Sequence, residues 1–252
     1  MRKVRLVLVR HGESEWNAAD IIQGHLGSDL SALGRDQAEV VSVTLRRRFG
    51  DASLIVSSDL ERVTQTAEPY RRDTGLPVIV DALWREIDNG AWSGKTHAQV
   101  AEAFPEEFAA ARRGEDIPRG GGETFAQLRR RVAGAVADRL AAAVADFTSA
   151  NADRPAAVED PHDPLLTAVV FTHGGPIRVA VAEVLGLLPS GHRQLQPPGN
   201  CSVTVVDYTV DVSGACRAAL IVAYNETDHL PSGGHANATD DVAATQAAVS
   251  SG

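Results

Sequence analysis

The chain has 252 residues, of which 44% are apolar, 5% aromatic and 23% charged, a composition typical of a globular protein rather than a disordered or fibrous one. Its net charge of −9 argues against broad binding to a nucleic-acid backbone, and the lack of an apolar run of about 18 residues argues against a membrane span. Two cysteines are too few for a disulfide framework, and the apolar run near the N-terminus is too short for an export signal, so we expect a cytoplasmic protein.

Short apolar runs alternate with helical patterns along the chain. We predict strands over residues 4–9, 54–56, 78–80, 168–171, 203–206 and 219–223. Strands that alternate with helices favour a three-layer α/β/α fold, in which helices cover both faces of a mostly parallel sheet.

The helices are predicted from apolar spacing together with start and stop residues. Their predicted ranges are 31–50 with Ser31 as N-cap, 59–75 with Asp59 as N-cap and a kink or early end at Pro69, 97–113 with a break at Pro105, 123–147 after the glycines 120–122, and a helix that starts at Pro176.

Residues 1–230 are predicted to form a single catalytic domain. Residues 149–164 are rich in Pro, Asp and Ala, which indicates an exposed loop. The last segment, 231–252, is rich in small and polar residues, and we expect it to be a disordered tail.

Polar clusters follow three of the predicted strands, at residues 10–12, 57–62 and 173–175. Ligands of open α/β sheets bind beyond the carboxyl ends of the strands, where the N-termini of helices also offer free N–H groups. Two histidines and two arginines are therefore predicted to meet at one edge of the sheet.

These residue types suit phosphoryl transfer. A neutral histidine can attack phosphorus near pH 7 without a separate base, and arginines stabilise the charge that spreads over the phosphoryl oxygens. The leaving oxygen needs a proton, which a carboxyl group could supply if burial raises its pKa. Glu86 is the candidate for this acid, although Asp88 lies only two positions further along.

Residues 6–17, LVLVRHGESEWN, resemble the signature of the histidine phosphatase superfamily, the phosphoglycerate-mutase-like enzymes. The resemblance continues in order at residues 23–24, 29–38, 56–67, 85–86, 121–124 and 172–175, so that it covers the chain from residue 4 to about residue 225. The glycolytic mutases of this family carry Glu-Arg-His-Tyr-Gly at the acid. Residues 86–90 read EIDNG here, which looks more like the phosphatase branch.

The resemblance implies a role for each matching residue. His11 would be the nucleophile that becomes phosphorylated, and Glu86 would be the acid and later the base for water. The residues implied to hold the phosphate are Arg10, Asn17, Arg62, His173 and Gly174, with Gln23 and Gly24 as possible substrate contacts.

Three functions remain open at this point. We favour hydrolysis of a small phosphomonoester, a sugar phosphate or a phosphoglycerate derivative, because residues 86–90 lack the Arg and Tyr of the glycolytic mutases. The alternatives are a mutase that depends on 2,3-bisphosphoglycerate and a non-catalytic protein that binds a phosphorylated ligand. We expect no metal or other cofactor, because the arginines already supply positive charge. A homodimer is a possible assembly.

Several other features are interpreted as structural. We expect the arginine runs 46–48 and 129–131 to lie on solvated helix faces. The remaining histidines, at positions 25, 97, 162, 192, 229 and 235, are assigned to solvated loops. The segment 90–96 ends in Gly-Lys-Thr, but it is one residue short of a phosphate-binding loop.

Overall fold

The computed structural model describes residues 1–50, 52–150 and 164–231. One sheet of six strands lies in this part of the chain, in the order β3-β2-β4-β1-β5-β6. The strands are β1 (Arg2–Arg10), β2 (Leu54–Ser57), β3 (Val78–Val80), β4 (Pro164–Thr172), β5 (Val203–Val210) and β6 (Cys216–Glu226). The pairs β2–β3, β2–β4 and β1–β4 are parallel, whereas β1–β5 and β5–β6 are antiparallel. The prediction of a mostly parallel sheet is therefore confirmed.

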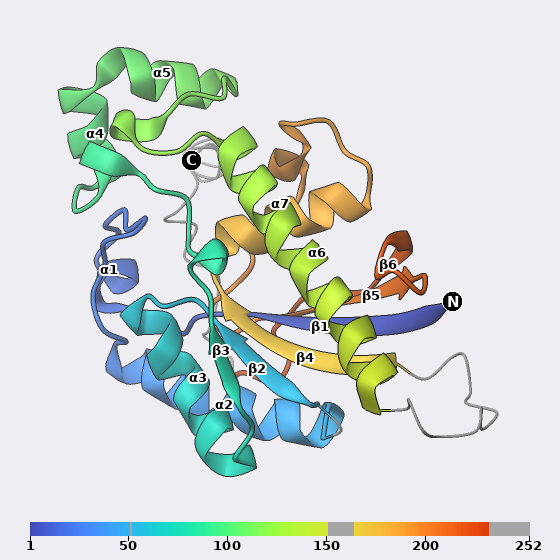
Figure 1. The fold of residues 1–252 in the computed structure, drawn as a ribbon. Helices are drawn as coiled ribbons and strands as arrows, with labels where there is room; N and C mark the ends of the chain where they lie inside the picture. Colours follow the sequence, from blue (N-terminus) through green and yellow to red (C-terminus); the bar gives the residue numbers. More distant parts are fainter. Residues whose placement is uncertain (51, 151–163, 232–252) are drawn as a thin grey trace.

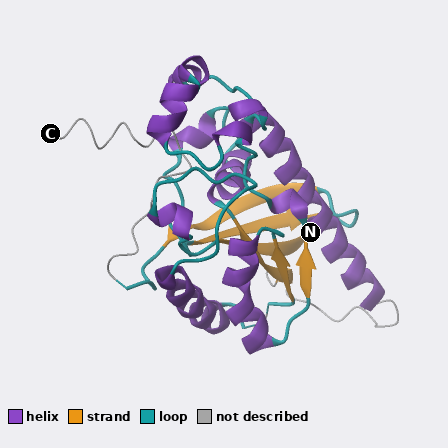
Figure 2. Cartoon of the chain, turned by 90° about the vertical axis from the view of Figure 1, so that its left-hand side faces the viewer, coloured by secondary structure: helices purple, strands orange, loops and turns teal. Residues whose placement is uncertain are grey.

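Helices cover both faces of the sheet, as Figures 1 and 2 show. On one face, Val7 and Val9 of β1 share a core cluster with residues of α2 (Ala32–Arg48) and α3 (Glu61–Thr74). On the other face, Leu6 and Leu8 pack into a cluster with α6 (Phe125–Ala150) and α7 (Gly174–Val184). Successive side chains of a strand point to opposite faces, so one apolar strand supplies both cores. This arrangement is the predicted three-layer fold.

The remaining helical segments are short, and α1, α4 and α5 lie beyond the carboxyl end of β1 (Figure 1). They are α1 (Glu15–Ala18), η1 (Ala82–Trp84), η2 (Gly90–Trp92), α4 (His97–Ala103), α5 (Pro105–Arg113), η3 (Arg119–Gly121) and η4 (Gly191–Gln194). A third core cluster, which includes Trp92, Val100 and Ala111, lies among these segments. None of the helices in the described part of the chain is long and apolar enough to cross a membrane.

Most predicted helix boundaries agree with the structure. Ser31 is the N-cap of α2, and its hydroxyl accepts a hydrogen bond from Gly34 N–H at 3.0 Å. The break at Pro105 separates α4 from α5. The helix that was expected to start at Pro176 begins two residues earlier, with His173 as its N-cap.

The prediction for the helix after β2 was wrong at two points. Asp59 does not cap α3, because the N-cap is Leu60 and the Asp59 carboxylate instead binds the guanidinium of Arg85. The helix does not end early at Pro69 but continues to Thr74, before Gly75 in a left-handed conformation. A proline removes only one backbone hydrogen bond, and Pro69 is buried where α3 packs, so tertiary contacts outweigh that loss. Most of the predicted loop 149–164 and all but the first residue of the predicted tail 231–252 lie outside the described residues.

Candidate active site

The strand register brings His11 and His173 together. β1 and β4 are parallel neighbours, and Arg10 pairs with Thr172 at the end of both strands. His11 directly follows Arg10, and His173 directly follows Thr172. The two rings therefore meet beyond the carboxyl edge of the sheet. Their centroids are 5.2 Å apart, and their planes are inclined at 66°.

The hydrogen bonds of His11 fix which ring nitrogen carries the proton. Its Nδ1 lies 2.7 Å from the carbonyl oxygen of Gly12, which can only accept a hydrogen bond. The proton of the neutral ring is therefore on Nδ1, and Nε2 keeps a lone pair, which accepts a hydrogen bond from Arg62 Nε at 3.3 Å. Burial, and then the charges of Arg62 and Arg10, lower the pKa of His11 well below its usual value. The ring is thus neutral at neutral pH.

Arg62 lies in the first turn of α3 and connects both histidines. Besides His11, it donates to His173 Nδ1 at 3.2 Å. Its other hydrogen bonds go to the carbonyl oxygens of Gly24 at 2.8 Å and Leu26 at 3.2 Å. The guanidinium plane is consequently held in one orientation, with its charge next to Nε2 of His11. Gly24, predicted as a possible substrate contact, thus orients Arg62 through its carbonyl group.

His173 is held from the opposite side by Ser58. The Ser58 hydroxyl lies 3.0 Å from His173 Nε2, and Arg62 already donates to Nδ1, so the neutral ring carries its proton on Nε2. Burial is the main cause that lowers the pKa of His173, followed by the charge of Arg62. Both histidines are therefore uncharged beside two permanently charged arginines.

Glu86 and Arg10 flank the start of α7. A methyl group on Gly174 would lie 3.7 Å from Arg10 Nε and 4.0 Å from Glu86 Oε2. The carboxylate of Glu86, 1% exposed, accepts hydrogen bonds from Ile87 N–H at 2.9 Å and Gly175 N–H at 3.1 Å. Arg10 is anchored by a hydrogen bond to the carbonyl of Pro198 at 2.7 Å. A cation and a carboxyl group thus both lie next to one helix N-terminus.

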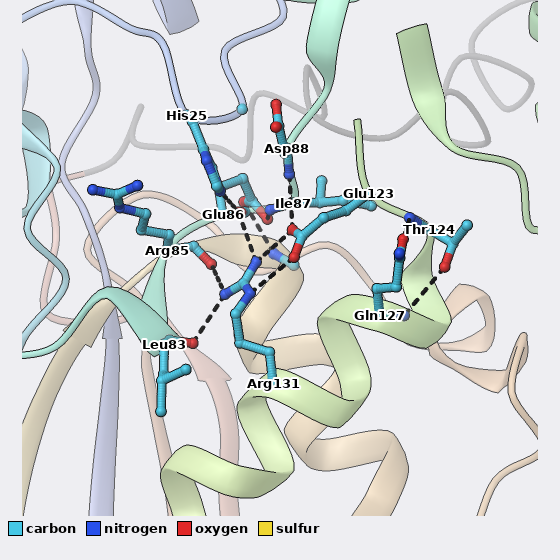
Figure 3. Close-up of polar contacts among 12 residues, drawn as sticks. His25, Leu83, Arg85, Glu86, Ile87, Asp88, Glu123, Thr124, Gln127 and Arg131 are labelled. Atoms are coloured by element: carbon cyan, nitrogen blue, oxygen red, sulfur yellow. Dashed lines mark hydrogen bonds and ion pairs between the residues drawn. The ribbon is translucent and has the colours of Figure 1, made fainter. Parts of the chain in front are cut away.

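Asp88, the competing acid, has a different environment. Its carboxylate accepts a hydrogen bond from Gly90 N–H at 2.9 Å, and its backbone pairs with Glu123. Figure 3 shows the side chain of Asp88 directed away from that of Glu86. Glu86 is therefore the carboxyl group that reaches the start of α7.

Asn17 and Gln23 are buried and meet at the hydroxyl group of Ser14. The Ser14 hydroxyl oxygen lies 2.9 Å from Gln23 Oε1 and 3.1 Å from Asn17 Oδ1, and its single proton is shared between these two acceptors. Among the described residues, Gln23 Nε2 has no hydrogen-bond partner. The roles of Asn17 and Gln23 as phosphate and substrate contacts stay predictions.

Sequence reasoning missed two residues that hold the loop of His11. Asn200 donates to the carbonyl of His11 at 3.1 Å, and Thr66 accepts the N–H of Gly12 at 3.0 Å. Thr66 lies one helical turn after Arg62, a spacing that could have indicated it, whereas nothing in the local pattern marks Asn200. The histidine assignments also need a correction, because His192 is 4% exposed and stacks on Phe125 at 3.9 Å between ring centroids.

The charged groups of this site fit an anionic ligand. Two guanidinium groups, two neutral histidine rings and the N-terminus of α7 converge on it, with one carboxyl group at its margin. Within the described residues, no group of three or more His, Cys, Asp or Glu side chains could hold a metal ion. The arrangement can therefore bind a phosphoryl group between cations and expose it to His11 Nε2.

Comparisons with known proteins agree with this chemistry. The family model of the histidine phosphatase superfamily (branch 1) matches residues 6–215. The chain is 37% identical over 202 residues to the glucosyl-3-phosphoglycerate phosphatase of Mycolicibacterium vanbaalenii, covering 80% of this chain and 83% of that protein. It is 32% identical over 230 residues to a protein of Yersinia enterocolitica named probable phosphoglycerate mutase, covering 90% and 95% of the two chains.

A solved structure extends the similarity to three dimensions. The native structure of a mycobacterial glucosyl-3-phosphoglycerate phosphatase superimposes with a TM-score of 0.71 at 31% identity. The match covers 90% of this chain and all of the other.

Proposed function

The chain belongs to the histidine phosphatase superfamily and is a phosphatase; on this premise we propose that His11 takes up the phosphoryl group of a phosphorylated sugar–glycerate. The observation that carries the proposal is the hydrogen bond of His11 Nδ1 to Gly12 O, because it leaves Nε2 as the nitrogen with a lone pair. The similarity to glucosyl-3-phosphoglycerate phosphatases supports the substrate class.

The first step is an attack of His11 Nε2 on the phosphorus atom. The N–P bond forms while the bond from phosphorus to the ester oxygen breaks, and the electron pair of that bond leaves with the oxygen. The substrate phosphate must enter beside Arg62, whose Nε–H now points to Nε2. The same N–H is then available to a phosphoryl oxygen, so that the guanidinium gains a charged partner during the reaction.

Positive charge compensates the oxygens of the transferred group. Arg62 and Arg10 supply two permanent charges, and the N-terminus of α7 adds partial positive charge. His173 supplies a further donor when the phosphate takes the place of Arg62 at Nδ1 and that nitrogen gains a proton, while Ser58 keeps its hydrogen bond to Nε2. Loss of one such donor typically lowers the rate of an enzyme by about 10²- to 10³-fold.

Glu86 acts as the general acid in this proposal. Its carboxyl proton goes to the leaving oxygen, and the resulting carboxylate then takes a proton from the water that attacks the phosphohistidine. The N–P bond breaks in the second step, which releases inorganic phosphate and returns His11 to its neutral state. No oxidant or reductant is needed, and the proton returns to Glu86.

Segments outside the phosphate pocket would recognise the rest of the substrate. The helices α4 and α5 lie beyond the carboxyl end of β1 (Figure 1), together with η2 and η3. In η3, the guanidinium carbon of Arg119 lies 4.8 Å from the centroid of the Phe125 ring. These segments belong to residues 88–125 and are the candidates for recognising the sugar and the glycerate group.

A second candidate function is phosphoglycerate mutase activity, which the similarity to the Yersinia protein favours. A mutase returns the phosphoryl group to an intermediate instead of water, so it must exclude water from the phosphohistidine. The two functions differ in their products and can be separated by one assay.

The test is turnover in EDTA of glucosyl-3-phosphoglycerate, 3-phosphoglycerate and p-nitrophenyl phosphate, by wild type and His11→Ala. We expect the wild type to release phosphate without metal, with the highest kcat/KM for glucosyl-3-phosphoglycerate. His11→Ala should release no phosphate. Interconversion of phosphoglycerates that depends on 2,3-bisphosphoglycerate, without phosphate release, would replace hydrolase by mutase. Phosphate binding without either reaction would support a non-catalytic binding protein.

A further inference from the structure

Arg131 of α6 contacts the segment that carries Glu86 (Figure 3). It donates to the carbonyl oxygens of Leu83 at 2.9 Å, Arg85 at 2.8 Å and Glu86 at 3.0 Å. Its side chain is only 15% exposed. The interpretation of the run 129–131 as a solvated helix face was therefore wrong for Arg131, because its guanidinium binds backbone carbonyls from a distant part of the chain.

Glu123 binds Arg131 and the other end of the same segment. Both of its carboxylate oxygens accept from Arg131, at 3.0 and 2.6 Å. Its Oε2 also accepts Asp88 N–H at 3.0 Å, and its own N–H donates to the carbonyl of Asp88 at 2.8 Å. Burial opposes ionisation of Glu123, but the hydrogen bonds from Arg131 and Asp88 outweigh it and lower the pKa of the carboxyl group. The ion pair is thus charged at neutral pH.

The segment has no regular structure of its own, and Arg131 and Glu123 hold it together with His25, whose Nε2 lies 3.0 Å from the carbonyl oxygen of Glu86. Residues 85–89 belong to no helix or strand. Arg131 holds the carbonyl groups of Leu83, Arg85 and Glu86. Glu123 holds the N–H of Asp88. Any shift of this backbone would move the Glu86 carboxyl away from the start of α7.

The charges of the pair matter as well as its hydrogen bonds. A general acid must hold its proton until the leaving oxygen needs it, and an unpaired guanidinium nearby would favour the ionised carboxylate. The carboxylate of Glu123 compensates the charge of Arg131. The pair can therefore hold the Glu86 segment without adding a net charge beside the acid.

We propose that Arg131 and Glu123 are positioning residues, which hold the Glu86 carboxyl where it protonates the leaving oxygen. The inference rests on the proposed role of Glu86 as the acid. It makes a prediction that a purely structural role does not. Loss of the pair should slow esters whose leaving group needs a proton much more than esters whose leaving group departs as a stable anion.

The test compares kcat/KM for glycerol 2-phosphate, an alkyl ester, with kcat/KM for 2,4-dinitrophenyl phosphate. The constant kcat/KM is used because it reports the step that forms the phosphohistidine. We expect Arg131→Ala and Glu123→Gln to lower the alkyl value by about 10²-fold or more and the dinitrophenyl value by less than about 3-fold. Arg131→Lys, which keeps the charge but not the planar fork, should restore part of the loss.

Two controls make the result decisive. Arg129→Ala removes an arginine of the same helix that binds Glu183 and the carbonyl of Leu187 instead, so both values should stay unchanged. Glu86→Gln should show the same selective loss as the pair, and a larger one.

The positioning role would be overturned if Glu86→Gln is selective but folded Arg131→Ala and Glu123→Gln lose kcat/KM equally on both esters, or on neither. An unselective Glu86→Gln would overturn the assignment of the acid and with it the positioning proposal. If Arg131→Ala does not fold, as judged by circular dichroism, Glu123→Gln and Arg131→Lys decide the result. If the wild type turns over neither ester, the proposed function itself fails.

Discussion

Gly175 lies so close to Glu86 that a side chain at position 175 would have to displace the Glu86 carboxyl group. A methyl group on Gly175 would lie 2.1 Å from Glu86 Oε1. The Gly175 N–H donates a hydrogen bond to Oε2 of the same carboxylate. The glycine is thus required by a close approach to a side chain, not by an unusual backbone conformation.

We therefore expect Gly175→Ala to move the Glu86 carboxyl group and to lower kcat/KM for alkyl phosphates by about 10²-fold, within the range for general acid catalysis. Kinetics with glycerol 2-phosphate measures this loss. Gly134→Ala is the matched control, because a methyl group at this position of α6 would meet nothing within 4 Å. It should leave kcat unchanged and raise the free energy of unfolding by about 0.5–1 kcal/mol. An unimpaired Gly175→Ala enzyme would contradict the proposed role of Glu86.

Arg62 should not tolerate replacement by lysine. Its guanidinium binds both histidines and two backbone carbonyls at once, which a single ammonium group cannot reproduce. We expect Arg62→Lys to lower kcat/KM by about 10²- to 10³-fold and to weaken binding of inorganic phosphate in titration calorimetry. Arg71→Lys, at the exposed end of the same helix, should match wild type. Normal phosphate affinity in Arg62→Lys would argue against Arg62 as a phosphate ligand.

Ser58 is predicted to orient His173. Its hydroxyl is the acceptor for His173 Nε2–H, and the buried ring would lose that partner in Ser58→Ala. We expect a loss of about tenfold in kcat/KM, which corresponds to one buried hydrogen bond. Ser57→Ala is the control, because that hydroxyl donates to the Ser58 carbonyl at 2.8 Å instead. Equal activities of the two variants would show that the orientation of His173 does not depend on Ser58.

The stability of the ligand-free protein should fall as the pH drops below about 6.5. His11 and His173 have lowered pKa values in the folded protein, so they stay neutral there while the unfolded chain binds protons. Unfolding then takes up protons, and the free energy of unfolding decreases with falling pH, by up to about 1.4 kcal/mol per pH unit for each histidine. His229, whose pKa is lowered by burial, contributes in the same direction.

Urea unfolding between pH 5 and pH 7 measures this dependence. The carboxyl groups with lowered pKa values, such as Asp59 and Glu123, act mainly below this range. The double variant His11→Asn/His173→Asn should flatten the dependence. An unchanged slope in the double variant would mean that the two rings are protonated in the folded protein.

Local patterns in the sequence were sufficient for the elements and for the place of the site. Branched apolar runs predict strands, and the polar residues that follow them, such as His11, Arg62 and His173, must lie at the carboxyl edge of a parallel sheet. The prediction failed where a local preference competed with a distant partner. Asp59 is a good N-cap residue in isolation, but it binds Arg85 instead, 26 positions along the chain.

The sequence by itself therefore determined the fold class, the family resemblance and most of the residues that meet at the candidate active site, because these depend on short-range periodicity and on contiguous motifs. Only the tertiary structure decided that Arg10 pairs with Thr172, that Gly12 O sets the tautomer of His11, and that Arg131 holds the segment of Glu86. Hydrogen bonds act over about 3 Å. Whether two groups from distant parts of the chain approach that closely is set by strand register and helix packing, which no local pattern records.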